Sequence, residues 1–189
     1  EILRCLVGSE MCIRDSYSSV NGVLFNRSKD KLICYPAGKV SSYKIPESVT
    51  SIGPFAFEYC TKLASVTIPE GVTEIGDSAF LDCAGLTSII LPDSVTRIGD
   101  SAFEECKNLT SVDIPEGVTS IGESAFGSCS RLTSVTIPNS VTEIRCFTFG
   151  SCRSLTSITI PDNVTSIGDS AFSYCLSPVS YTHLRAHET

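Results

Sequence analysis

The chain has 189 residues, ten cysteines and a formal net charge of −7, with 42% apolar and 19% charged residues. This composition suits one domain, or two small ones, with a buried core, and no apolar run approaches the ~20 residues of a membrane-spanning helix. The acidic balance argues against a nucleic-acid-binding protein, because such proteins cluster Lys and Arg to neutralise phosphates.

The two ends of the chain are related to each other at the level of DNA. When residues 5–15 are back-translated, the reverse complement of that DNA encodes residues 179–189. The same DNA resembles the adapter of transposase-based sequencing libraries. We therefore expect residues 1–16 and 178–189 to be non-native flanks that match no position of the repeat described below. Both histidines of the chain lie in the second flank, so their spacing is not taken as a metal site.

Residues 17–39 are predicted to form an N-terminal hairpin, or capping unit. Two apolar stretches, Val23–Phe25 and Leu32–Tyr35, flank a polar turn at Arg27–Asp30. A hairpin at this place would cover the first coil of the array that follows.

Residues 40–177 consist of six repeats of 23 residues, with no insertion or deletion. A proline, a phenylalanine and a cysteine recur at this interval, beginning with Pro46, Phe57 and Cys60. A unit of this size is too small to bury its own apolar side chains. Successive units are therefore expected to stack, so that equivalent residues form columns through one core.

The second repeat shows the path expected for every coil. Alternation over Ala64–Ile68 predicts a strand with Val66 inside, and Pro69 ends it because proline has no N–H to donate. A short second strand over Val72–Ile75 and one helical or 3₁₀ turn, which carries the phenylalanine and the cysteine, complete the coil. The predicted fold is a solenoid with a parallel β-strand ladder.

The pattern L-x-x-V-x-I-P-x-x-V-x-x-I-G-x-x-A-F-x-x-C across residues 40–177 resembles the BspA-like, or Treponema pallidum-type, leucine-rich repeat family. The resemblance implies a leucine-rich-repeat solenoid from a cell-surface or secreted adhesin that binds host, matrix or cell-surface proteins. We expect the chain to be a fragment of such a protein. The alternatives are a structural spacer, and a recognition arm whose catalytic domain lies outside the fragment.

The cysteine column is predicted to be a ladder of buried thiols, with disulfides and a metal site as the alternatives. Equivalent side chains of stacked coils point the same way, whereas a disulfide needs converging Cβ atoms. Zinc sites need paired cysteines or histidines, which residues 17–177 lack. Cys146 falls outside the period. The ladder consists of Cys60, Cys83, Cys106, Cys129, Cys152 and Cys175.

Nothing in the repeats suggests catalysis. Without histidine no Ser-His-Asp or Cys-His site can form, and no phosphate-binding glycine motif is present. We expect no enzyme activity, no cofactor and no metal. A column of acidic residues is assigned to capping the helical turns. This column consists of Asp77, Asp100, Glu123 and Asp169.

The outward positions of the main strand form the candidate binding face. In leucine-rich repeats the strand face is the usual recognition surface, and curvature makes it a concave platform. We expect Ile90 and Asp113 to give it local character. The face comprises an invariant column, Ser42, Ser65, Ser88, Ser111, Ser134 and Ser157, and a variable one, Lys44, Thr67, Ile90, Asp113, Thr136 and Thr159. A competing surface is the outward column of the second strand, Glu74, Arg97, Ser120, Glu143 and Ser166.

Overall fold

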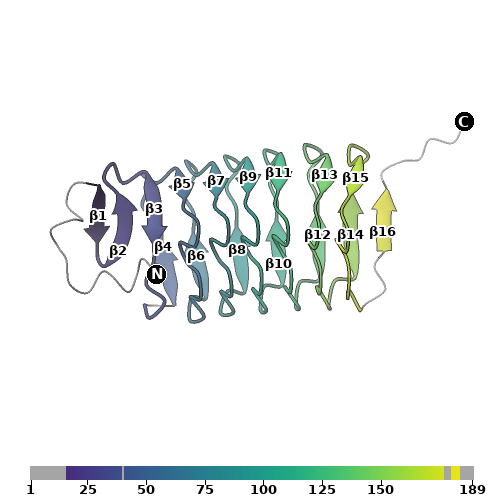
Figure 1. Ribbon diagram of the computed structural model, residues 1–189, viewed down its shortest axis with the longest axis horizontal. Coiled ribbons are helices and arrows are strands. Elements are labelled where there is room, and N and C mark those ends of the chain that lie inside the picture. Colours follow the sequence, from purple (N-terminus) through teal and green to yellow (C-terminus); the bar gives the residue numbers. More distant parts are fainter. Residues whose placement is uncertain (1–15, 40, 177–179, 184–189) are drawn as a thin grey trace, which may run out of the picture.

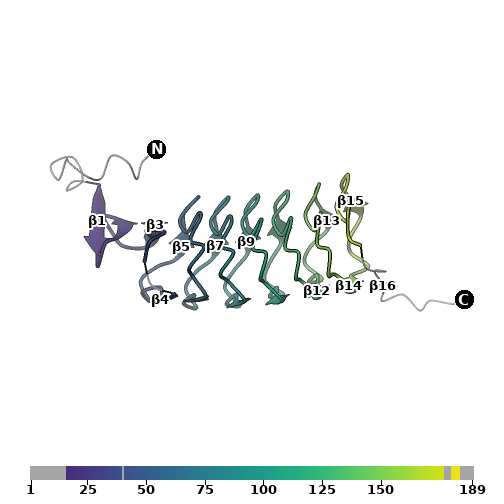
Figure 2. The same cartoon turned by 90° about the horizontal axis from the view of Figure 1, so that it is seen from below.

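The computed structural model describes residues 16–39, 41–176 and 180–183 of the chain. The chain winds into coils that follow one another along a nearly straight axis, with a hairpin at the N-terminal end (Figure 1). Figure 2 shows the same straight stack after a 90° turn. The strand surface is therefore a long flat strip and not the concave platform expected from the sequence.

Every coil contributes a main strand and a shorter second strand. Three strands precede the first coil: β1 (Tyr17–Val20), β2 (Val23–Asn26) and β3 (Lys31–Cys34). The main strands are β4 (Ser42–Lys44), β6 (Ser65–Thr67), β8 (Ser88–Ile90), β10 (Ser111–Asp113), β12 (Ser134–Thr136), β14 (Ser157–Ile160) and β16 (Ser180–His183). The second strands are β5 (Ser51–Ile52), β7 (Glu74–Ile75), β9 (Arg97–Ile98), β11 (Ser120–Ile121), β13 (Glu143–Ile144) and β15 (Ser166–Ile167).

The strands form parallel ladders whose register equals the repeat length. The main strands make one seven-stranded sheet from β4 to β16, in which Ser42 pairs with Ser65 and Ser134 with Ser157. The second strands β5, β7, β9 and β11 extend the sheet that begins with β1, β2 and β3, and β13 and β15 form a separate two-stranded sheet. The predicted solenoid and its N-terminal hairpin, β2 and β3, are confirmed; β1 adds a strand that was not predicted.

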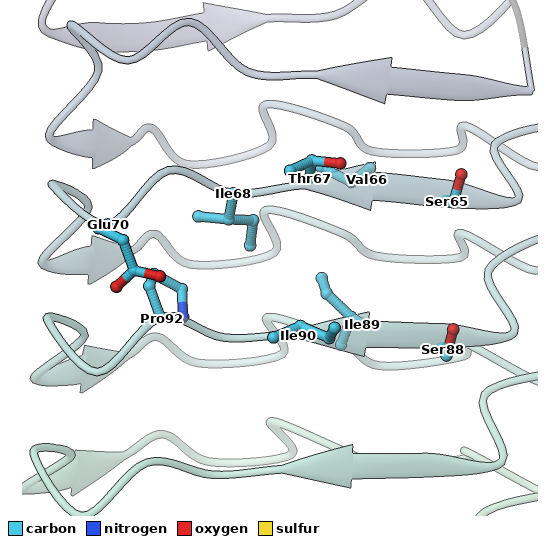
Figure 3. A pocket seen from close by; sticks show the side chains of 9 residues that line it. All are labelled: Ser65, Val66, Thr67, Ile68, Glu70, Ser88, Ile89, Ile90 and Pro92. Carbon is cyan, nitrogen blue, oxygen red and sulfur yellow. The ribbon is translucent and has the colours of Figure 1, made fainter.

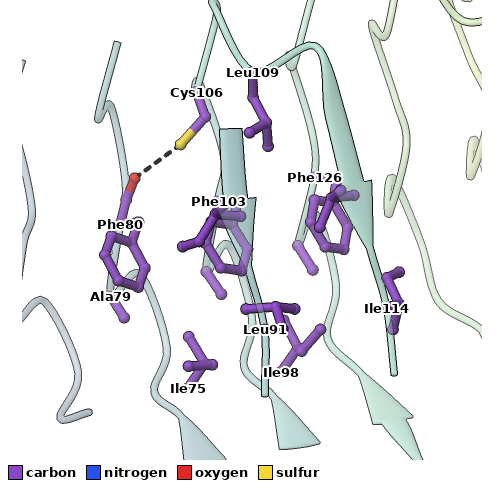
Figure 4. Close-up of a cluster of buried hydrophobic side chains, with 14 of the residues drawn as sticks. Ile75, Ala79, Phe80, Leu91, Ile98, Phe103, Cys106, Leu109, Ile114 and Phe126 are labelled. Carbon is purple, nitrogen blue, oxygen red and sulfur yellow. Dashed lines mark hydrogen bonds between the residues drawn. The ribbon is translucent and has the colours of Figure 1, made fainter. Parts of the chain in front are cut away.

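The core is built from stacked columns, of which the phenylalanines are the largest. From Phe57 to Phe172, successive rings lie 4.8 to 5.7 Å apart between centroids and within 6° of parallel. This distance is close to the ~4.8 Å between neighbouring strands, so the rings follow the spacing of the backbone. Figure 4 shows Phe80, Phe103 and Phe126 stacked in this way above the isoleucines of the second strands.

The predicted helical turn is wrong: the described residues contain no helix. Ser78 and Asp82 have left-handed backbones, with φ of 54° and 50°, and two β-turns replace the helix. These turns are closed by hydrogen bonds from the N–H of Ala79 to the carbonyl of Gly76 and from that of Cys83 to Phe80. The N–H of Leu81 likewise donates within the coil, to Ser78, whereas those of Ser78, Phe80 and Asp82 donate to the next coil, as Phe80 does to Ala102 at 2.7 Å. Bonding between coils thus takes the donors that a helix would use internally.

A column of glycines lets the second strands approach closely. A Cβ atom added to Gly122 would lie 2.4 Å from the carbonyl carbon of Gly99 in the preceding coil, which no real contact allows. The fifth coil has Arg145 at this position, and there β13 is not paired with β11 within the described residues. The ladder resumes between β13 and β15. We attribute the break to the side chain that replaces glycine.

The expectation that residues 178–189 match no repeat position is wrong for β16. Ser180 pairs with Ser157 and Thr182 with Thr159, the register of every other coil. The predicted adapter origin of this flank and of residues 1–16 stays a prediction, and residues 1–15 lie outside the described part.

We predict that deleting residues 178–189 lowers the stability of the chain, because β14 loses its outer partner. The expected decrease in the free energy of unfolding is about 1–2 kcal/mol, measured by urea denaturation. Deleting residues 184–189 alone is the control. An unchanged midpoint after the longer deletion would show that β16 adds nothing.

The glycine column provides a second test. Gly122→Ala is expected to destabilise the chain by about 1–3 kcal/mol, because its methyl group meets backbone that cannot move aside. In Gly71→Ala the new Cβ would lie 3.7 Å from the nearest atom, the carbonyl oxygen of Val49, so this control should stay within about 0.5 kcal/mol of the unmodified chain. Equal effects of the two substitutions would contradict the proposed close stacking.

Candidate binding face

The structure brings the predicted binding residues together on the outer surface of the main sheet. In β6, β8, β10 and β12 the first and third residues are exposed and the central one is buried. Ile90 lies between Thr67 and Asp113 in the register and is 81% exposed. We call this surface, the outward side chains of β4 to β14, the strand face.

A shallow groove of about 360 Å³ lies on the strand face between β6 and β8. The strands β6 and β8 are paired at Thr67 and Ile90, whereas β8 and β10 pair over three residues. Its lining is Ser65, Val66, Thr67, Ile68, Glu70, Ser88, Ile89, Ile90 and Pro92 (Figure 3). Four of these residues belong to the predicted face, Ser65, Thr67, Ser88 and Ile90.

Glu70 and Pro92 were not predicted from the sequence; they reach the groove from the corners after the main strands. In Figure 3 the carboxylate of Glu70 extends toward Pro92 of the next coil. A signal was present in the sequence. The third repeat has Ile89, Ile90 and Leu91 where the second has Val66, Thr67 and Ile68. Its main strand is therefore the most apolar of the six repeats.

The competing surface, on the second strands, is largely occupied by its own ion pairs. Arg97 donates to the carboxylates of Glu74, at 2.6 Å, and Asp77, at 3.0 Å. In the fifth coil Arg145 lies 3.8 Å from Asp100. These side chains satisfy one another, which leaves fewer unpaired charges for a partner than the strand face offers.

The acidic column has a different role from the helix capping predicted for it. The carboxylate of Asp77 accepts a hydrogen bond from the N–H of Asp100 at 3.1 Å, and that of Asp100 accepts one from Glu123 at 2.9 Å. Asp77 and Asp100 thus each bind the backbone of the next coil and help to hold the coils together.

A family model described as "BspA type Leucine rich repeat region" matches residues 31–145 and 119–185 of the chain. The chain belongs to this BspA-type leucine-rich repeat family. No curated protein matches it significantly. Repeat arrays of this kind offer an extended surface for interaction with proteins.

Several solved structures of bacterial proteins resemble the chain. A leucine-rich cell surface protein from Faecalibacterium prausnitzii is 35% identical, with a TM-score of 0.71 over 85% of this chain and 43% of its own. The Treponema pallidum leucine-rich repeat protein is 28% identical, with a TM-score of 0.71 over 87% of both chains. The pneumococcal vaccine antigen PcpA is 27% identical, with a TM-score of 0.70 over 88% of this chain and 48% of its own. The chain thus spans less than half of two of these proteins.

Among the described residues of this BspA-type chain, no helix is long and apolar enough to cross a membrane. The same part of the chain holds no group of three or more His, Cys, Asp or Glu residues placed to bind a metal ion.

The cysteine column of the BspA-type repeat lies in the interior, beside the phenylalanines. From Cys83 to Cys175, each thiol donates to a phenylalanine carbonyl of the preceding coil, as Cys106 does to Phe80 at 3.2 Å (Figure 4). The first, Cys60, lies 3.6 Å from the carbonyl of Tyr35. All eight described cysteines are free. Cys146 lies outside the column and is partly exposed, and so is Cys175, the last member of the column, unlike the five buried thiols before it. The column therefore satisfies carbonyl groups of the core.

Burial makes these thiols poor nucleophiles. Desolvation raises the pKa of Cys60, Cys106 and Cys152 to about 12, and it raises the pKa of Cys129 as well. The thiolate is the reactive form of cysteine, so the column is expected to be inert at neutral pH.

We predict that the BspA-type array loses stability at alkaline pH. The unfolded chain releases its thiol protons near pH 9, whereas the folded chain keeps those of Cys60, Cys106 and Cys152 until about pH 12. The unfolded state therefore binds fewer protons in this window, and the free energy of unfolding should fall by up to about 1.4 kcal/mol per pH unit and per cysteine. Urea denaturation between these pH values measures the slope. Cys106→Ala should reduce it, and an unchanged slope would contradict this origin.

Thiol titration tests whether the cysteines are reduced, in a variant that carries Cys5→Ser and Cys12→Ser. When this variant is denatured without reductant, all eight remaining cysteines should titrate as free thiols. In the folded chain at neutral pH, Cys146 should react quickly, whereas the buried thiols of Cys60, Cys83, Cys106, Cys129 and Cys152 should react slowly. A thiol missing after denaturation would instead support a disulfide.

Proposed function

We propose that the chain is a non-catalytic protein-binding module of a bacterial cell-surface or secreted adhesin. The observation that carries this proposal is the strand face: a flat array of exposed side chains in which the invariant serines alternate with a variable column. Such a surface gives a partner many regularly spaced contacts on a rigid support. Only the variable column distinguishes one coil from the next.

The relatives support the location that we propose. One similar structure is a cell surface protein and another is a vaccine antigen. We propose that this chain is likewise exposed outside the cell, where a host, matrix or cell-surface protein is the partner. The chain covers less than half of the length of these two relatives, which is compatible with a binding module that belongs to a larger protein.

A structural spacer is the competing proposal. A straight stack with satisfied backbone groups is suited to hold another domain away from a surface, and most of the strand face carries only small hydroxyl side chains. A spacer needs no particular residue on any face. The two proposals therefore differ in the effect of substitutions on the strand face.

We predict that the strand face mediates capture of surface proteins. The immobilised full chain is incubated with biotinylated surface proteins of epithelial cells, and a variant with Thr67→Lys and Thr136→Lys is compared with it. The variant should lose the captured proteins, because lysine disrupts contacts at two coils of the face. The control carries Ser120→Lys and Ser166→Lys, the same charge change on the second strands, and should retain them. Equal capture by all three chains, or none by any, would favour the spacer.

A further inference from the structure

The negative charge of the molecule is concentrated in the second to fourth coils. Residues 63–131 contain eleven carboxylates and three basic side chains. The three basic residues have partners of their own: Arg97 pairs with Glu74 and Asp77, Lys107 with Glu105, and Arg131 donates to the amide of Asn108. Lys107 and Arg131 lie in turns before the main strands and Arg97 in β9, so no basic side chain of these coils lies at the corner after a main strand.

That corner carries an acidic residue in each of these coils. Glu70, Asp93 and Glu116 follow the prolines that end the main strands, and Asp113 projects from β10 beside them. Glu116 accepts a hydrogen bond from the N–H of Asn139. Glu70, Asp93 and Asp113 make no ion pair with any residue that the structure describes. We call Glu70, Asp93, Asp113 and Glu116 the acidic rim.

The groove on the strand face lies directly against this rim, since Glu70 is part of its lining. The rest of its interior is mostly apolar, with Ile68, Ile89 and Pro92 beside the exposed Ile90 (Figure 3). At the same position of the column, Thr67 and Thr136 are hydroxyl residues. An isoleucine that is 81% exposed gains free energy when another aliphatic side chain covers it.

We propose that the groove and the acidic rim together bind an extended, cationic segment of a partner protein that carries one aliphatic side chain. The aliphatic side chain lies in the groove against Ile90, and Lys or Arg side chains on either side of it pair with Glu70, Asp93 and Asp113. The apolar contact supplies most of the affinity, while the unpaired carboxylates select a basic partner and accelerate its association. This inference rests on the proposed protein-binding function and specifies the partner's chemistry.

The probe is a fluorescent, acetylated and amidated peptide of sequence Lys-Thr-Lys-Thr-Leu-Thr-Lys-Thr-Lys. Fluorescence anisotropy measures its binding to the full chain at ~50 mM and ~200 mM salt, because screening weakens contacts between exposed charges. One control peptide has serine for leucine and another has glutamate for every lysine. We expect binding of the first peptide only, weaker at the higher salt.

Variants of the chain separate the contribution of the groove from that of the acidic rim. Ile90→Thr, which installs the residue that the preceding coil has at Thr67, should weaken binding about tenfold without affecting the fold. A chain with Glu70→Gln, Asp93→Asn and Asp113→Asn should lose most of the salt dependence. Glu143→Gln, on the second strands, is the matched control and should bind as the unmodified chain does. Circular dichroism verifies that each variant is folded.

Three results would overturn the inference: no binding of the lysine–leucine peptide, equal binding of the serine or glutamate peptide, or binding unaffected by the substitutions at Ile90 and the rim. Its failure is distinguishable from failure of the proposed function. If the strand face captures surface proteins but the peptide does not bind, the module binds proteins of other chemistry. If neither occurs, both proposals fail.

Discussion

The constraint on which the rest of this structure depends is that each residue must fit against its own equivalent one strand spacing away. This requirement explains why the 23-residue period tolerates no insertion, and why flat rings and small thiols recur in the core. It is strictest at the glycines, where the backbone of one coil touches that of the next. Two members of the acidic column meet the same requirement on the surface, because the carboxylates of Asp77 and Asp100 bind N–H groups of the following coil. Burial and backbone hydrogen bonding are thus satisfied between units and not within them.

The sequence predicted the strands and the core well, because both follow from the period and from the alternation of residues such as Val66 and Thr67. It failed at the segment that contains Ala79, Phe80 and Cys83, whose spacing also suits one turn of a helix. The decision depends on where the N–H groups find acceptors, and the acceptors belong to a coil that is 23 residues away. The groove was missed for a similar reason. Its lining combines Glu70 of one coil with Pro92 of the next. These two residues occupy different positions of the repeat, so a comparison of equivalent positions does not bring them together.

Function in a repeat protein is expected where the repeat departs from its own pattern. Most positions of this chain are determined by stacking, and the invariant serines of the strand face repeat without variation. Ile90 and Asp113 are the predicted departures on that face, and the structure adds Glu70 as their neighbour on the groove. The balance of apolar and acidic groups there is a local property of three coils. It arises without any change in the fold, so related arrays can keep the same core and present different faces.

The break between β11 and β13 has a consequence for how the molecule responds to force. In a linear stack, tension applied to the ends passes through every junction in turn, so that the weakest junction separates first. The fourth and fifth coils are joined by the main sheet, the aromatic column and turn hydrogen bonds, but they lack the ladder of second strands found at the other junctions of β5 to β15. The array should therefore yield as two blocks, with the N-terminal block retaining the groove and its acidic rim while the C-terminal block unravels.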